Sequence, residues 1–176
     1  MLQRRWHVLL LAALLICSCA SPVLRKDILD QGTRNPNMAE LTQAPIPHRG
    51  KLFIFGGIIA STKFTQQGSL IEGMYVPVDE KGALENIPAT SHRFLALCPR
   101  SSGLLDPVIY RSGRHVTIAA NFMDVRQGKL GEMEYAYPFF EIREIYLWPT
   151  KPRVYYYPFP EYVYPYPGYP GYGPWW

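Results

Sequence analysis

The sequence predicts a small all-β barrel of five or six antiparallel strands, preceded by a tether and followed by a disordered aromatic tail. Three observations support this fold. Between residues 50 and 149, short β-branched and aromatic runs alternate with glycine, proline and asparagine. Glycines stand inside the expected strands, as they do where small barrels bend. The 176 residues leave room for only one globular core.

The first two strands are expected at residues 51–60 (KLFIFGGIIA) and 69–78 (SLIEGMYVPV). Both are apolar and rich in β-branched residues. Gly56 and Gly57 lie inside the first of them, and they favour a bend or a bulge there. This half of the domain therefore predicts two neighbouring strands, one of them strongly bent.

A loop and a third strand follow. Residues 79–91 contain glycine, asparagine and proline, which predicts a connecting loop. Residues 93–98 (RFLALC) form the third strand, and residues 101–107 a turn or a single helical turn. Within this turn, the Asp106 side chain is expected to bond a nearby backbone amide, while Pro107 fixes the next dihedral.

The next strand is expected at residues 115–122 (HVTIAANF). Gly113 precedes it and is expected to adopt a positive φ angle, with Arg114 as a solvated charge at the strand end. Gly128 and Gly131 then predict a turn.

Residues 133–148 predict two short strands or one long strand kinked at Pro138. Alternate positions predict an inward face formed by Tyr135, Tyr137, Phe139 and Ile142, and an outward face formed by Glu134, Glu141 and Arg143. Together these strands fit a closed or partly open barrel similar to the oligonucleotide/oligosaccharide-binding (OB) fold. A small sandwich is the alternative.

Residues 1–18 have the pattern of a bacterial lipoprotein signal. Arg4 and Arg5 precede an apolar run from residue 8 to residue 16, which is too short to span a bilayer as a helix. Ser18 then supplies a small residue directly before Cys19. We therefore expect the signal to be removed and the chain to begin at Cys19.

Cys19 is the predicted lipidation site, because a thiol is nucleophilic enough to accept a diacylglyceryl group. Cleavage before Cys19 then frees its amine to accept a further acyl chain such as palmitate. Cys17 fits less well, since the branched Ile16 precedes it. In lipoproteins that stay in the inner membrane, aspartate usually follows the lipidated cysteine. Here Ala20 follows Cys19, so we expect sorting to the outer membrane.

The segments that flank the barrel are polar or repetitive. Residues 19–49 suit a lipidated tether. In this tether Asn37 is placed to cap a short helix through about Gln43, although an irregular loop is the alternative. Residues 150–176 form a low-complexity tail whose part from residue 151 holds eight tyrosines, seven prolines and two tryptophans. We expect this tail to be disordered, or to contact lipid headgroups or glycans through its aromatic rings.

The composition argues against nucleic-acid binding and against catalysis. Arg4 and Arg5 account for two of the four net positive charges and are expected to leave with the signal. The mature chain is therefore not strongly basic, as a nucleic-acid-binding domain usually is. Cys98 could pair with His92 or His115 as nucleophile and base, but it lies in an apolar strand, where a buried, inert thiol is expected. The mature histidines also lack metal-ligand spacing, and we expect no metal or cofactor.

Several short motifs follow one another along the domain. They are residues 56–60, 93–96, 105–107, 113–117, 131–132, 137–138 and 147–149, with Tyr110 and Tyr135. With the signal at Cys19, this order resembles the Slp family of starvation-inducible outer-membrane lipoproteins over about residues 38–148. The resemblance implies an envelope lipoprotein. It carries over no catalytic residue and no ligand.

Two functional hypotheses follow. The preferred one is a non-enzymatic lipoprotein of a Gram-negative outer membrane, anchored through acylated Cys19 with its domain in the periplasm. Its role would be structural or in protein interaction, linked to starvation or stress. The alternative is a binding module in which the barrel face or the tail recognises peptidoglycan, lipopolysaccharide or a small ligand.

Overall fold

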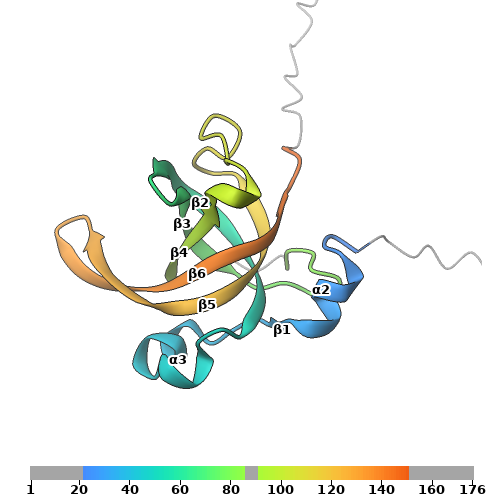
Figure 1. The fold of residues 1–176 in the computed structure, drawn as a ribbon, viewed down its shortest axis with the longest axis horizontal. Helices are drawn as coiled ribbons and strands as arrows, with labels where there is room; N and C mark the ends of the chain where they lie inside the picture. Colours follow the sequence, from blue (N-terminus) through green and yellow to red (C-terminus); the bar gives the residue numbers. More distant parts are fainter. Residues whose placement is uncertain (1–21, 86–90, 151–176) are drawn as a thin grey trace, which may run out of the picture.

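The computed structural model describes residues 22–85 and 91–150, and within them five strands close into a barrel. The strands are β2 (Leu52–Thr65), β3 (Gly68–Val76), β4 (Arg93–Pro99), β5 (His115–Leu130) and β6 (Met133–Leu147). They pair in the order β2-β3-β4-β6-β5, and β5 pairs again with β2. Figure 1 shows the barrel with its long β5–β6 hairpin extending to one side. The predicted small OB-like barrel is confirmed.

One pair in the barrel is parallel rather than antiparallel. All neighbouring strands of the ring are antiparallel except β4 and β6. A closed ring with an odd number of strands cannot alternate direction at every pair, so one parallel pair is unavoidable. The additional short strand β1 (Thr33–Arg34) lies outside the ring and also pairs in parallel, with β2.

The centre of the barrel is a cluster of phenylalanine rings. Phe140 on β6 contacts rings from three other strands, with centroid separations of 4.8 Å to Phe55, 5.5 Å to Phe122 and 6.4 Å to Phe94. These four side chains are completely buried. Because the rings come from strands far apart in the sequence, their packing closes the barrel.

Gly56 and Gly57 do not form the predicted bulge. The register of β2 against β3 shifts two residues later, between Ile59 and Ser61. Gly57 instead makes room for the Phe94 ring, since a Cβ at this position would lie 2.7 Å from Phe94 Cζ. Close packing therefore explains why Gly57 has no side chain.

β5 is longer than predicted. It continues past residue 122 to Leu130, and Gly128 lies within it, paired with Tyr135 of β6. A Cβ on Gly128 would lie 3.1 Å from the Tyr137 ring, so this glycine also reflects close packing. Only Gly131, with a φ of 65°, lies in the turn.

β6 is one strand, and its inward face differs from the prediction. Ile142 points into the core as expected, but its inward neighbour is Phe140 instead of Phe139. Phe139 pairs with Leu95, on the face opposite to Phe140, and the Arg126 guanidinium covers its ring at 3.4 Å from the centroid. Because both faces of this strand carry buried rings, alternation alone could not identify the face that points into the core.

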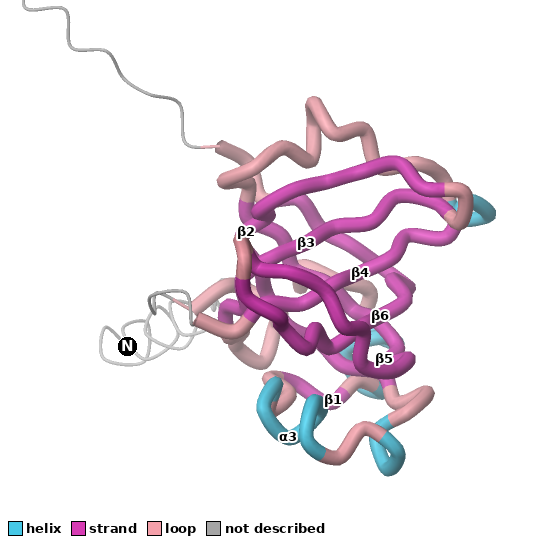
Figure 2. The backbone as a smooth tube through the Cα atoms, turned by 90° about the vertical axis from the view of Figure 1, so that its left-hand side faces the viewer, coloured by secondary structure: helices cyan, strands magenta, loops and turns pink. Residues whose placement is uncertain are grey.

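The described part of the predicted tether lies against the barrel. Helix α2 (Lys26–Gln31) covers the outer face of β2 and β5. The residues in this outer cluster are Leu24, Ile28, Leu29, Ile54, Val78 and Ala119. Helix α3 (Met38–Gln43) begins at Asn37, whose side chain accepts hydrogen bonds from Ala39 N and Glu40 N, which confirms the predicted cap. Figure 2 shows α3 below one end of the barrel.

Two predicted segments fall outside the described residues. These are residues 1–21, with the signal and Cys19, and the tail from residue 151 onward. Within the part that is described, no helix is both long and apolar enough to cross a membrane.

Replacing Phe140 with alanine should destabilise the barrel strongly. The change removes a fully buried ring that touches three others and leaves a cavity, so we expect a loss of about 3–5 kcal/mol in the free energy of unfolding. Urea titration of the detergent-solubilised protein measures this loss. Phe64→Ala is the matched control, because Phe64 is exposed, and it should change stability by less than about 0.5 kcal/mol. Equal losses in the two variants would contradict the central role of Phe140.

Candidate functional site

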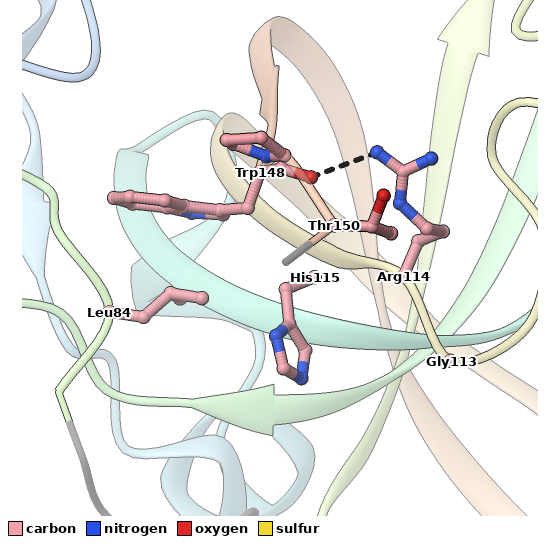
Figure 3. Close-up of a pocket in the computed structure, with 7 residues that line it drawn as sticks. Leu84, Gly113, Arg114, His115, Trp148 and Thr150 are labelled. Atoms are coloured by element: carbon pink, nitrogen blue, oxygen red, sulfur yellow. Dashed lines mark hydrogen bonds between the residues drawn. The ribbon is translucent and has the colours of Figure 1, made fainter. Parts of the chain in front are cut away.

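A hollow of about 510 Å³ lies on the outer surface of the barrel, where β5 begins and β6 ends. Its described lining consists of Leu84, Gly113, Arg114, His115, Trp148, Pro149 and Thr150. Figure 3 shows one face of the Trp148 indole turned toward the side of the hollow on which Leu84 and His115 lie. The lining is mainly apolar, which is typical of a site that binds by stacking and shape.

A chain of hydrogen bonds fixes the Trp148 indole. Its backbone N–H donates to His115 O at 3.0 Å, which extends the β5–β6 pairing by one step. Its indole Nε1–H donates to Thr117 Oγ1 at 3.0 Å, and this hydroxyl donates to Gly82 O at 2.9 Å. Trp148 therefore links β5, β6 and the loop after β3, and its ring has a set orientation.

Tyr146 adds a second aromatic ring beside the hollow. It contacts Trp148 edge to face, with centroids 5.1 Å apart and an interplanar angle of 83°. The side chain of Tyr146 is partly exposed to solvent. A rigid aromatic pair next to a hollow is the arrangement that stacks on sugar rings or on other flat ligands.

Arg114 is not the solvated charge that the sequence predicts. It is partly buried, and its guanidinium donates to Trp148 O at 2.8 Å and to Ile109 O at 3.3 Å. Among the described residues its buried Nε has no hydrogen-bond partner. Arg114 thus ties the connection between β4 and β5 to the end of β6. The two turn predictions beside it are confirmed, since Gly113 has a φ of 80° and Asp106 Oδ1 accepts from Val108 N at 2.7 Å.

The structure does not assemble the thiol and imidazole pair considered above. Cys98 faces the core near the end of β4, whereas His92 precedes the start of the same strand. Six extended residues span about 20 Å, which is too far for proton transfer. His115 is exposed and lines the outer hollow. Neither histidine can therefore act as a base for this thiol.

Cys98 has the surroundings of an inert thiol. It is a free, buried cysteine, and its Sγ lies 3.7 Å from Gly103 O. Burial raises the pKa of the thiol, which disfavours the reactive thiolate. Within residues 22–85 and 91–150, no three His, Cys, Asp or Glu side chains are grouped to hold a metal ion.

Sequence reasoning found the fold but not the hollow. Trp148 entered only as a member of a family motif, His115 was also considered as a base for Cys98, and Leu84 was part of an expected loop. Leu84 reaches the site because an isolated bridge pairs it with Val78 and folds the loop back. A tryptophan next to the end of a β-strand was the one available signal. Cys19, the predicted lipidation site, lies outside the described residues.

Comparison with known proteins gives one match. A sequence profile of the outer membrane lipoprotein Slp family matches residues 16–176, which include the whole barrel. Neither the curated proteins nor the solved structures contain a match.

Cys98 should resist alkylation while the protein is folded. Iodoacetamide should modify it rapidly only in urea, because the folded core excludes the reagent and disfavours the thiolate. The pKa of Cys98 is raised in the folded state, so its modification rate should still increase with pH in the range where the rate of an ordinary thiol has reached its maximum. Intact-mass measurement follows the reaction. A Cys98→Ser protein with Ser102→Cys, which moves the thiol to an exposed position, should react at once; equally fast reaction of native Cys98 would overturn its assignment as inert.

Proposed function

Because this chain belongs to the outer membrane lipoprotein Slp family, we propose that it is anchored through acylated Cys19 and holds its barrel at the periplasmic face of that membrane. Its role is non-enzymatic, structural or in protein interaction, under starvation or stress. The family membership supports the location. The inert surroundings of Cys98 support a role without catalysis.

The observation that carries this proposal is that the fold begins directly after the predicted anchor. Val23 N donates to Lys81 O at 3.1 Å, and the Leu24 side chain is buried in the outer cluster. Arg25 then pairs with Glu144 of β6 at 3.0 Å. A chain from Cys19 to Val23 spans at most about 14 Å. The anchor would therefore hold the barrel against the lipid surface, where it can act as a fixed docking domain.

Replacing Cys19 with alanine should abolish palmitate incorporation and release the protein from the outer-membrane fraction, because the proposed acylation requires the thiol of Cys19. Labelling with radioactive palmitate and membrane fractionation measure both effects. Cys98→Ser is the matched control and should keep the label. Ala20→Asp should keep the label and move the protein to the inner membrane. Label on the Cys19→Ala protein would refute the anchor.

A second candidate function is glycan binding at the hollow, and the aromatic pair of Trp148 and Tyr146 favours it. The sugar would stack on the indole, whose orientation the hydrogen bond to Thr117 fixes. Peptidoglycan fragments and lipopolysaccharide are the available glycans of the envelope.

Trp148→Ala should weaken binding of peptidoglycan fragments or lipopolysaccharide by about two- to tenfold, since one stacked aromatic ring contributes roughly 0.5–1.5 kcal/mol. Calorimetric titration of the full mature protein measures this change. Trp148→Phe keeps a ring and should retain most of the binding. Deletion of residues 155–176 tests the tail separately; loss of binding in the deletion but not in Trp148→Ala would place the site in the tail and contradict the hollow.

A further inference from the structure

One end of the barrel exposes several apolar side chains. They lie on the β2–β3 hairpin and on the connection between β4 and β5, and we call them the apolar end surface: Phe64, Leu104, Val108 and Ile109. Val108 is 78 % exposed, although valine is usually buried. In Figure 1 this β4–β5 connection and the end of β6 lie at the top of the barrel, opposite α3. A group of exposed apolar residues on a small domain marks a contact surface.

Hydrogen bonds hold the two parts of this surface together. Thr62 Oγ1 donates to Tyr110 O at 2.7 Å, and Arg100 N donates to Gln67 O at 2.9 Å. Leu105 N donates to the buried Ser69 hydroxyl at 2.9 Å, and Ser69 is paired with Phe64 across the hairpin. The connection is therefore fastened to the hairpin that carries Phe64.

The turn that carries Val108 and Ile109 is also fixed from within. Asp106 Oδ1 accepts from Val108 N, and Asp106 O accepts from the backbone N–H groups of Ile109 and Tyr110. Arg114 donates to Ile109 O from the other side. With its backbone held in this way, the turn cannot rotate its apolar side chains into the core.

Basic residues surround the apolar end surface. Lys63, Arg100 and Arg111 are exposed in the segments 62–69 and 99–114, whose single acidic residue is Asp106. At the opposite end of the barrel, Ile46 is followed in the chain by His48 and Arg49, and these two residues pair with Glu40 and Asp124. Apolar side chains between basic ones are complementary to an anionic phospholipid surface, where aliphatic groups enter the interface and cations meet phosphates.

We propose that the apolar end surface is a second membrane contact, which inserts Val108 and Ile109 into the interface of an anionic phospholipid leaflet. This inference rests on the proposed anchoring at Cys19 and adds an orientation to it. The anchored barrel stands with its β4–β5 connection on the membrane and α3 directed away from it.

The positions of the chain ends agree with this orientation. Arg114 donates to both Trp148 O and Ile109 O, so the described chain, which ends at Thr150, ends beside the apolar end surface. A Cβ on Gly82 would lie within 3.8 Å of both Val23 and Thr117, so the anchored end of the fold lies near the start of β5. That start is continuous with the connection that carries Val108.

The test compares two labelled positions in the full mature lipoprotein. A nitrobenzoxadiazole dye is attached to Val108→Cys or to Ile46→Cys, which is 74 % exposed at the α3 end and serves as the matched control. Each protein is reconstituted in phosphatidylethanolamine vesicles with about one quarter phosphatidylglycerol. The dye at position 108 should shift to shorter emission wavelengths and be quenched by doxyl-labelled lipid. The dye at position 46 should remain in water.

Co-flotation with the vesicles reports the anchor separately. Protein that floats while the dye at position 108 stays in water refutes the membrane contact and leaves the anchor intact. A blue shift at position 46 instead of position 108 also refutes it, because the opposite end would then face the lipid. Lys63→Glu with Arg111→Glu should lower the quenching at position 108; unchanged quenching would refute the role assigned to the basic residues.

Discussion

The barrel depends on the fit of the Phe94 ring against two glycines. A Cβ would lie 2.5 Å from this ring at Gly73 and 2.7 Å from it at Gly57, distances at which something must shift. Because these positions have no side chain, the ring can reach Phe55 and Phe140 in the centre, at 5.0 Å and 6.4 Å between centroids. A small barrel has little interior volume, so its rings and its glycines must be matched across strands.

This closure places the other surfaces of the molecule. The outer face of β2 and β5 receives α2, which fixes the start of the fold beside the predicted anchor. The end of β6 returns next to the start of β5, where Trp148 and His115 form one side of the hollow. The connection between β4 and β5 crosses the adjoining end and exposes Val108. The start of the described fold, the hollow and the apolar end surface therefore lie around β5, the strand that closes the ring.

The two proposed functions use different parts of this arrangement. A docking lipoprotein needs only a rigid domain held close to the lipid, which the early start of the fold supplies. A glycan-binding module needs an accessible ring in a fixed orientation, which the Trp148 hydrogen bonds supply. A barrel standing on its β4–β5 connection would leave α3 and its surroundings directed toward the periplasm, where partner proteins can reach them.

The sequence by itself determined most of the β-strands, the Asn37 cap and the Asp106 turn, because each depends on neighbouring residues. Periodicity could not decide which face of β6 points inward, because Phe139 and Phe140 lie on opposite faces and both rings are buried. It also assigned Gly128 to a turn, and it could not show that Gly57 packs against Phe94 and Gly128 against Tyr137. Only the tertiary structure decided the parallel β4–β6 pair, the hollow at Trp148 and the apolar end surface. These features join residues that are distant in sequence, and ring closure alone brings them together.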